Sequence, residues 1–358
     1  MKKEFKILVI NPGSTSTKIG VFQDEKLLFE EVLRHSTEEI SKYERTYDQY
    51  AFRRDIIVET LKKNNIPLKS LDCIVGRGGM LKPVEGGTYE INEAMIEDLK
   101  VGVQGDHASN LGGIIAKEIG TEIGVPSYVV DPVTVDEMED IARISGLAEI
   151  KRRSIVHALN HKAIARKWAK ENGKKYEEAN LIIAHLGGGI SVGAHKNGKI
   201  IDVFNALYGD GAFSPERSGG LPVGDLVKLC YSGKYSHSDM KKMIKGKGGI
   251  VSYLGTQDVR EVKKMIEKGD KKAELIYNAM AYQVAKDIGA CAAVLKGEVD
   301  GILLTGGIAH DSDFTALIEE RVKFISKVYV YPGEDELDAL ALGGLRVLRG
   351  EEMPKVYK

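Results

Sequence analysis

Two distant segments of this 358-residue chain share one pattern, and this repeat constrains the fold more than any other feature of the sequence. Residues 7–28 read ILVINPGSTSTKIGVFQDEKLL, and residues 181–201 read LIIAHLGGGISVGAHKNGKII. Each segment is an apolar strand, a polar residue (Asn11 or His185), a loop of small residues, a second strand and a tight turn. Single hairpins with glycine turns are common, but two in matching order predict a duplicated fold whose loops face one cleft.

Short apolar runs alternate with longer amphipathic stretches along the chain. The runs are typical of strands in a sheet that is covered on both faces, which predicts strands at residues 7–10, 73–75, 128–130, 181–184 and 302–304. The amphipathic stretches predict helices at residues 47–63, 93–100, 108–123, 155–171, 275–295 and 336–349, with Asn92 and Ser154 as N-caps. This alternation indicates an α/β architecture with mostly parallel sheets.

Composition and charge exclude several classes of protein. The chain has 51 Lys and Arg against 52 Asp and Glu, so we do not expect nucleic acid as a partner. The 3 cysteines lie far apart and outside any CxxC pattern, which argues against a disulfide framework and a cysteine zinc site. No stretch approaches the roughly 18 apolar residues of a membrane helix, and the N-terminal apolar run is too short for a signal peptide. We therefore expect a cytoplasmic protein without a membrane partner.

Three loops are candidate phosphate cradles. Small residues let backbone N–H groups approach phosphate oxygens, and Ser or Thr hydroxyls add donors. The candidate groups are Ser14, Ser16 and Lys18 in the first loop, Gly187, Gly188 and Gly189 in the second, and Gly306 and Gly307 in the third. The third loop follows a predicted strand, at the edge where open α/β sheets bind ligands.

Two apparent motifs are rejected. Residues 193–200 nearly match a Walker A loop, but Ile200 offers no hydroxyl for Mg²⁺ and the segment reads as a hairpin turn. His157 and His161 are spaced like zinc ligands on one helix face. The glutamate of an HExxH motif is missing and no third ligand is evident, so we do not expect zinc.

Five segments carry a resemblance to a known family: INPGSTSTKIGVF, GRGGMLKPVEGG, HLGGGISVG, DGAFSPERSGGLP and LLTGGIAH. In this order they resemble the acetate and butyrate kinase family over essentially the whole chain. The resemblance implies duplicated actin-like (ribonuclease H-like) domains, each a mixed sheet flanked by helices, with a central cleft. It implies reversible phosphoryl transfer between ATP and a short-chain carboxylate, with Mg²⁺, and a homo-oligomer. We expect one domain of residues 1–149 plus 335–358 and a nucleotide-binding domain of residues 150–334.

The resemblance also assigns catalytic roles. Arg77 matches the family arginine that holds the substrate carboxylate, and Arg217 matches the arginine at the transferred phosphoryl group. Asp131 matches the catalytic aspartate. His157 and His185 match the two histidines that donate to the phosphoryl oxygens.

The metal and nucleotide sites follow from the same resemblance. Asn11 matches the family asparagine near Mg²⁺, and Glu336 matches the C-terminal acid associated with the metal, although Glu334 and Asp335 are near enough to take its place. Gly306 and Gly307, with Ile308, match the turn that binds adenosine.

Departures from the acetate kinase pattern favour the butyrate branch of the family, with butyrate, isobutyrate or another branched-chain acid as substrate. Gly79 stands where acetate kinases have valine, and Val156 stands where they have phenylalanine, so both are expected to leave room for a longer acid. The alternative is that Gly79 is only a turn glycine that needs a positive φ, with the pocket formed elsewhere.

Phosphoryl transfer to a carboxylate needs cationic and hydrogen-bonding groups such as these arginines and histidines. A carboxylate is already ionised at neutral pH and needs no base, so the obstacle is its repulsion from the triphosphate, which cationic and hydrogen-bonding groups offset. We expect direct in-line transfer without a phosphoenzyme, with Asp131 orienting an arginine or the water shell of the metal. Two alternatives are a kinase with a hydroxyl acceptor, in which Asp131 is the base, and an actin-like ATP-binding clamp, filament or chaperone.

Overall fold

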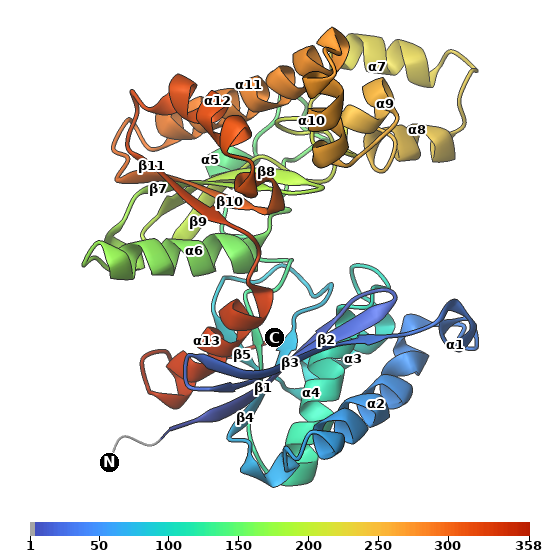
Figure 1. Cartoon of the computed structure of the whole chain (residues 1–358), viewed down its shortest axis with the longest axis vertical. Helices are drawn as coiled ribbons and strands as arrows, with labels where there is room; N and C mark the ends of the chain where they lie inside the picture. Colours follow the sequence, from blue (N-terminus) through green and yellow to red (C-terminus); the bar gives the residue numbers. More distant parts are fainter. Residues whose placement is uncertain (1–3) are drawn as a thin grey trace. The chain divides into compact units, whose positions relative to one another are not determined.

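The computed structural model describes residues 4–358, which form two compact units (Figure 1). The first unit comprises the chain up to Val135 together with residues 335–358, and the second comprises residues 136–334. Residues 136–149 therefore belong to the second unit and not to the first, where we had expected them. The reason is their contacts: Glu139 N donates to Ile201 O (2.9 Å), and Glu137 forms a buried ion pair with Lys162 (2.8 Å).

A seven-stranded mixed sheet forms the centre of the first unit, in the order β12-β5-β6-β4-β1-β2-β3. β1, β2 and β3 form an antiparallel meander, β4 runs parallel to β1, and β6 runs parallel to β4. The strands are β1 (Lys6–Pro12), β2 (Ser16–Gln23), β3 (Lys26–Arg34), β4 (Cys73–Arg77), β5 (Thr88–Glu90), β6 (Ser127–Val130) and β12 (Lys355–Val356).

Helices cover both faces of this sheet (Figure 1). On one face, α2 and α4 pack into an apolar core with β1 and β4. On the other face, the glycines of α13 allow close contact, because a Cβ at Gly344 would lie 2.6 Å from Val75 Cγ2. The helices are α1 (Thr37–Ile40), α2 (Tyr50–Lys63), α3 (Glu93–Val101), α4 (Asn110–Ile123) and α13 (Glu336–Leu348), with the 3₁₀ turns η1 (Thr46–Gln49) and η2 (Leu68–Ser70).

The five-stranded sheet of the second unit repeats this topology, in the order β11-β10-β7-β8-β9. β7, β8 and β9 form an antiparallel meander, β10 runs parallel to β7, and β11 runs parallel to β10. The strands are β7 (Leu181–Leu186), β8 (Ile190–Lys196), β9 (Lys199–Val203), β10 (Gly301–Gly306) and β11 (Val328–Pro332). The predicted duplication with mixed sheets is confirmed.

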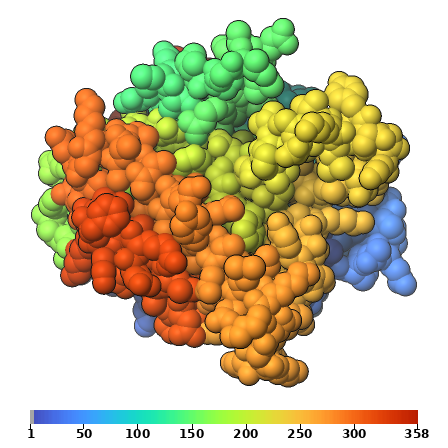
Figure 2. Space-filling view, turned by 90° about the horizontal axis from the view of Figure 1, so that it is seen from above, coloured from blue at the N-terminus to red at the C-terminus, as the bar shows by residue number. Residues whose placement is uncertain are grey.

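In the second unit α11 and α12 cover one face of the sheet and α6 covers the other (Figure 1). Between β9 and α11 the chain adds short helices, α7 to α10, which form part of the surface seen in Figure 2 (yellow to orange). The helices are α5 (Asp140–Arg143), α6 (Ala158–Glu171), α7 (Val223–Cys230), α8 (His237–Ile244), α9 (Ile250–Leu254), α10 (Val259–Glu267), α11 (Lys271–Val294) and α12 (Ser312–Val322), with η3 (Tyr176–Glu178) and η4 (Gly307–His310).

Two local predictions are confirmed and one is wrong. Asn92 caps α3 by accepting from Met95 N (3.0 Å). The tight turn expected at the end of the second repeat falls at Asn197 and Gly198, whose positive φ values, 51° and 74°, are those of a type I′ turn. Ser154 is not an N-cap, because α6 begins only at Ala158. The residues before it lie in neither a helix nor a strand, and Ile155 O accepts from Ala206 N (3.0 Å).

Within residues 4–358, no helix combines the length and apolar character needed to cross a bilayer.

Candidate active site

In the first unit three predicted site residues lie at the carboxyl ends of neighbouring parallel strands. Asn11 is near the end of β1, Arg77 ends β4, and Asp131 directly follows β6. These strands are adjacent in the sheet order, so their ends meet at one edge. The predicted binding edge is therefore the edge at which these side chains gather.

Glu336, the first residue of α13, joins this group. Its Oε1 lies 2.8 Å from Arg77 Nη1, and its Oε2 accepts from Asn11 Nδ2 at 2.7 Å. Arg77 is mostly buried, and its Nη1 makes no hydrogen bond of acceptable geometry with any of residues 4–358 despite the ion-pair contact. A buried guanidinium nitrogen that lacks a hydrogen bond is suited to accept an anionic ligand.

The glycines around Arg77 let α4 approach β4 closely. A Cβ at Gly76 would lie 2.2 Å from Gly112 O, and a Cβ at Gly112 would lie 2.5 Å from Arg77 O. Asn110, the first residue of α4, accepts from Met80 N with its Oδ1 (2.8 Å). These contacts fix the backbone that carries Arg77.

This packing corrects our expectation for Gly79. A Cβ at Gly79 would lie 2.3 Å from Asn110 Oδ1, 2.6 Å from Asn110 Cα and 2.8 Å from Leu99 Cδ2. The space beside Gly79 is thus filled by protein and is not room for a longer acid. Gly79 also has no positive φ, so the alternative of a turn glycine is wrong as well. The glycine is needed because the helix comes close.

Asp131 is buried and has a φ of 37°, in the left-handed region that non-glycine residues seldom adopt. Its Oδ1 accepts from Gly87 N (2.7 Å), and its own N donates to Gly87 O (3.0 Å). Such strain is commonly retained at functional sites. The carboxylate therefore holds the chain that precedes β5, at the same sheet edge as Arg77.

A buried arginine that the sequence reading missed holds the first glycine–serine loop. Arg53, on α2, has no exposed surface. Its guanidinium donates to three backbone carbonyls, those of Gly13 (2.8 Å), Ser14 (3.0 Å) and Ser16 (3.1 Å). Gln49 Oε1 accepts from the same group at 2.8 Å. Burial lowers the pKa of Arg53 to about 10.

This arrangement orients the loop. In a trans peptide the C=O and the following N–H point in opposite directions. Because Arg53 binds the carbonyls of Gly13 and Ser14, the N–H groups of Ser14 and Thr15 point away from it, at residues that are exposed. Outward N–H groups are what a phosphate cradle needs. Lys18 instead forms an ion pair with Glu30 on β3 (2.8 Å).

In the second unit the two predicted histidines stack on each other. The rings of His157 and His185 have centroids 3.8 Å apart and planes inclined by 15°. His157 Nδ1 lies 2.9 Å from Ser191 Oγ. His185 Nδ1 lies 2.8 Å from Asn160 Oδ1, and its Nε2 lies 3.0 Å from Glu334 Oε1. The structure thus brings both histidines together at the carboxyl end of β7.

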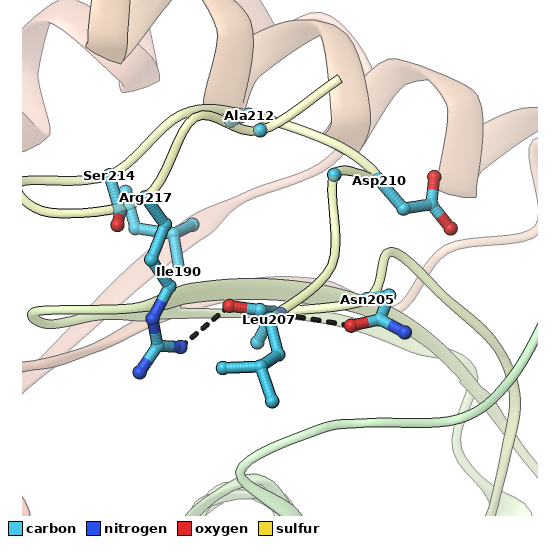
Figure 3. A pocket seen from close by; sticks show the side chains of 10 residues that line it. Ile190, Asn205, Leu207, Asp210, Ala212, Ser214 and Arg217 are labelled. Carbon is cyan, nitrogen blue, oxygen red and sulfur yellow. Dashed lines mark hydrogen bonds between the residues drawn. The ribbon is translucent and has the colours of Figure 1, made fainter. Parts of the chain in front are cut away.

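The triple-glycine loop after β7 lies against Arg217. A Cβ at Gly189 would lie 1.9 Å from Arg217 Nη1, so only glycine leaves space for the guanidinium. Arg217 Nη1 donates to Ala206 O at 2.6 Å. In Figure 3 a dashed line leaves the guanidinium group of Arg217. Its Nε is buried and has no hydrogen-bond partner among residues 4–358. Gly187 is similarly close to His185, with 3.0 Å between its ideal Cβ and Nε2.

The loop that carries Arg217 lines a small, partly open pocket (Figure 3). Helix α11 holds this loop by its N–H groups: Ala212 N donates to Asp287 Oδ2 (2.7 Å), and Phe213 N donates to Gln283 Oε1 (3.2 Å). Burial, with Asp210 adding repulsion, raises the pKa of Asp287 to about 7. Asp287 and Gln283 carried no motif and were missed.

The third glycine turn, at Gly306 and Gly307, lies beside the carboxyl end of β7. Gly306 has a φ of 90°, and a Cβ there would lie 2.4 Å from Leu186 O, the last residue of β7. Gly307, by contrast, faces open space, and Ile308 packs against the apolar core. This turn therefore joins the histidines at the edge of the second sheet. Val156 is buried just before His157.

The residues fit a metal that arrives with its ligand better than a resident one. Within residues 4–358, no three His, Cys, Asp or Glu side chains are grouped as a metal site requires. Asn11 and Glu336, however, supply the oxygen-bearing side chains that Mg²⁺ prefers, and Mg²⁺ commonly takes one or two carboxylates together with substrate phosphates and water.

Comparisons with known proteins agree with this geometry. The model of the acetokinase family matches residues 146–330. The chain is 61% identical over 354 residues to butyrate kinase 1 of Clostridium acetobutylicum, covering 99% of this chain and 100% of the relative. It is 60% identical over 353 residues to a probable butyrate kinase of Clostridium botulinum, covering 99% of both.

Solved structures share the fold. The acetate kinase of Entamoeba histolytica matches with a TM-score of 0.78 at 17% identity, over 96% of this chain and 100% of that one. The acetate kinase of Porphyromonas gingivalis matches with a TM-score of 0.77 at 21% identity, over 94% and 98%. These likenesses show the duplicated actin-like fold. With a family model over more than half of its length and relatives of this identity, the chain belongs to the acetokinase family.

Proposed function

We propose that this protein is a short-chain carboxylate kinase that reversibly transfers the γ-phosphoryl group of ATP to butyrate, or to isobutyrate or another branched-chain acid. The observation that carries the proposal is the 61% identity, over 99% of this chain, to a butyrate kinase. We expect the protein to act as a homo-oligomer in the cytoplasm.

The two arginines support the assignment. Arg77 and Arg217 are both largely buried: Arg217 keeps a buried Nε without a hydrogen bond among residues 4–358, and the buried Nη1 of Arg77 forms an ion pair with Glu336. Such groups stabilise a site only when an anion completes them. In this proposal Arg77 binds the carboxylate of the acid and Arg217 binds the transferring phosphoryl group.

The second unit binds the nucleotide in this proposal. Gly306, Gly307 and Ile308 lie against adenosine, while Gly187, Gly188 and Gly189 offer backbone N–H groups to the phosphates. His157 and His185 donate to the phosphoryl oxygens, where negative charge builds up during transfer. Ser14 and Ser16 offer further donors from the loop that Arg53 orients.

No residue has to form a covalent intermediate. A carboxylate oxygen attacks the γ-phosphorus in line, the bond to the bridging oxygen breaks, and ADP leaves with its electron pair. Mg²⁺, when bound, neutralises phosphate charge, and Asn11 and Glu336 are the residues that would hold it. Asp131 holds its loop through Gly87 and does not act as the nucleophile.

The source of the preference for longer acids lies outside Gly79, whose surroundings are filled. Val156 remains a candidate wall, because it is buried directly before His157. Val156→Phe should lower kcat/KM for butyrate relative to acetate by roughly fifteenfold, since butyrate has two more methylenes than acetate and each is worth about 0.8 kcal/mol in an apolar pocket. Equal losses for both acids would remove Val156 from the pocket.

Trapping the acyl phosphate with hydroxylamine tests the whole proposal. The purified protein is incubated with ATP, Mg²⁺ and one acid from a panel from acetate to valerate that includes isobutyrate. We expect most hydroxamate from C4 acids. ADP release without hydroxamate from any acid would favour a hydroxyl acceptor or a clamp ATPase and would overturn the proposal.

A further inference from the structure

Four of the eight histidines lie in one part of the second unit, and the predicted chemistry uses only two of them. The other two, His161 and His195, are completely buried. They belong to a continuous line of hydrogen-bonding contacts that begins at Tyr176 and ends at His157.

Each contact in the line has hydrogen-bond length. Tyr176 Oη lies 2.8 Å from His195 Nδ1, and His195 Nε2 lies 3.1 Å from His161 Nδ1. His161 Nε2 lies 3.0 Å from Ser191 Oγ, and Ser191 Oγ lies 2.9 Å from His157 Nδ1. Every interior member therefore faces one partner on each side.

The interior histidines are neutral. Burial, and then the nearby charge of Lys162, lowers the pKa of His195 well below its usual range. Burial does the same for the pKa of His161, and the two rings would repel each other if both were protonated. Lys162 is itself fixed by its buried ion pair with Glu137 (2.8 Å). A protonated histidine ring in this line would be buried near the charged ammonium group of Lys162, and the two positive charges would repel each other.

A neutral imidazole has one donor and one acceptor nitrogen, and a hydroxyl has one proton to donate. The protons from Tyr176 to His161 must therefore all point the same way. A Ser191 hydroxyl that accepts from His161 keeps its one proton to donate to His157. If Tyr176 donates to His195, each following group donates to the next, and Ser191 donates to His157 Nδ1. If the direction is reversed, His157 Nδ1 carries the proton instead.

The end of the line decides between the two directions. A phenol donates readily to a basic imidazole nitrogen but is a poorer acceptor. Two cations lie near the Tyr176 ring and favour a phenol that gives up its proton: Lys162 Nζ at 5.6 Å and Arg166 Cζ at 5.7 Å from the ring centroid.

We propose that Tyr176, through His195, His161 and Ser191, fixes His157 as the tautomer with its proton on Nε2, so that this nitrogen is a ready hydrogen-bond donor. This inference rests on the proposed function, in which His157 donates to a phosphoryl oxygen. Tyr176, His195, His161 and Ser191 are then positioning residues, because none of them has to touch the substrate.

The tautomer can be measured directly. Long-range ¹H–¹⁵N spectra of the full-length protein labelled with ¹⁵N-histidine report which ring nitrogen carries the proton, and a His157→Gln variant identifies the signals. We expect an unprotonated Nδ1 and a protonated Nε2 for His157 in the wild type. A proton on Nδ1 would overturn the proposal without any variant.

Tyr176→Phe removes the group that sets the direction. We expect the His157 signals to move to values averaged over both tautomers, and kcat to fall about twofold with the KM for ATP unchanged, because a rate through one tautomer scales with its population. Tyr277→Phe is the matched control, since Tyr277 is a buried tyrosine of the same unit that donates to Asp311 (2.8 Å) away from the line. Wild-type His157 signals in Tyr176→Phe would overturn the proposal.

Failure of the two proposals can be told apart. If the wild type makes no acyl phosphate from any acid, the proposed function fails, but the nitrogen shifts of His157 still decide the tautomer. If the shifts match both directions equally in the wild type, the line sets nothing, whatever the activity.

Discussion

The two units build the same meander and then fix their binding loops by opposite means. In the first unit a buried cation, Arg53 on α2, donates to loop carbonyls. In the second unit an acid and an amide on α11, Asp287 and Gln283, accept from loop N–H groups. The first loop is therefore left with N–H groups facing outward, and the second presents the side chain of Arg217 instead.

This difference shows how the two halves of a duplicated fold can present different groups, backbone N–H groups in one unit and an arginine side chain in the other. A loop whose carbonyls are bound offers backbone donors to an anion, whereas a loop whose N–H groups are bound must recruit a charged side chain. In both units the anchoring residues differ from the residues that we propose to bind the ligand. The anchoring residues lie on a helix behind the loop, and they determine which face of the backbone points outward.

The largest expected effect comes from the arginines that the two units present. Arg77→Ala and Arg217→Ala should each lower kcat/KM by at least about 10³-fold, because an arginine at phosphoryl transfer contributes roughly 10³–10⁵ in rate. Steady-state kinetics with butyrate and ATP measure this, with circular dichroism to show that the fold is intact.

Exposed arginines of the same units provide the controls. Arg34 lies on the surface of the first unit, and Arg260 lies on the surface of the second. Alanine at either position should leave kcat/KM within about twofold of the wild type, because exposed ion pairs contribute little. Near-normal kinetics for Arg77→Ala or Arg217→Ala would remove that arginine from the site.

Arg53→Met tests the anchoring of the first loop. It leaves the carbonyls of Gly13, Ser14 and Ser16 without their buried donor, so the free energy of unfolding should fall by about 3 kcal/mol. Urea unfolding measures the loss. Arg54→Met, one residue along α2 in a surface ion pair with Glu122, should cost less than about 1 kcal/mol. Equal losses would contradict the anchoring role.

Gly79→Ala and Gly307→Ala compare a tight glycine of the first unit with an open one of the second. A Cβ at Gly79 collides with the backbone of Asn110, so stability should fall by about 1–3 kcal/mol, and activity with acetate and butyrate should fall equally. A Cβ at Gly307 meets no atom within 4 Å. The unfolding free energy of the Gly307→Ala variant should therefore stay within about 0.5 kcal/mol of the wild-type value. A selective loss with butyrate in Gly79→Ala would restore the pocket that we have rejected.

Asp287→Asn tests the anchoring of the second loop. Because the pKa of Asp287 is raised to about 7 in the folded protein from 3.8, the native state binds its proton more tightly, and stability falls as pH rises from about 4 to 7. Asparagine keeps an acceptor for Ala212 N without the charge. The variant should therefore exceed the wild type by at least about 1 kcal/mol at pH 8 and match it near pH 4. A pH-independent difference in urea unfolding would contradict this.

The strand and hairpin pattern was readable from the sequence because it is local. Apolar runs of strand length and the Asn197–Gly198 turn depend on neighbouring residues, and parallel strands end at a common edge. Asn11 and His185 could thus be assigned to strand ends before the structure. The start of α6 was not readable, because the carbonyl of Ile155 accepts from a partner, Ala206 N, that is remote in sequence.

The sequence by itself determined that this chain folds as a repeated α/β unit with polar residues at corresponding strand ends, since periodicity and glycine spacing are written in short segments. Only the tertiary structure decided which side chains those residues meet. Arg53 looks like any arginine of an amphipathic helix, and Gly79 looks like a pocket glycine, until α2 and α4 are packed on the sheet. The same holds for His195 and Tyr176, because hydrogen-bond partners far apart in sequence are chosen by packing and burial, which no local pattern encodes.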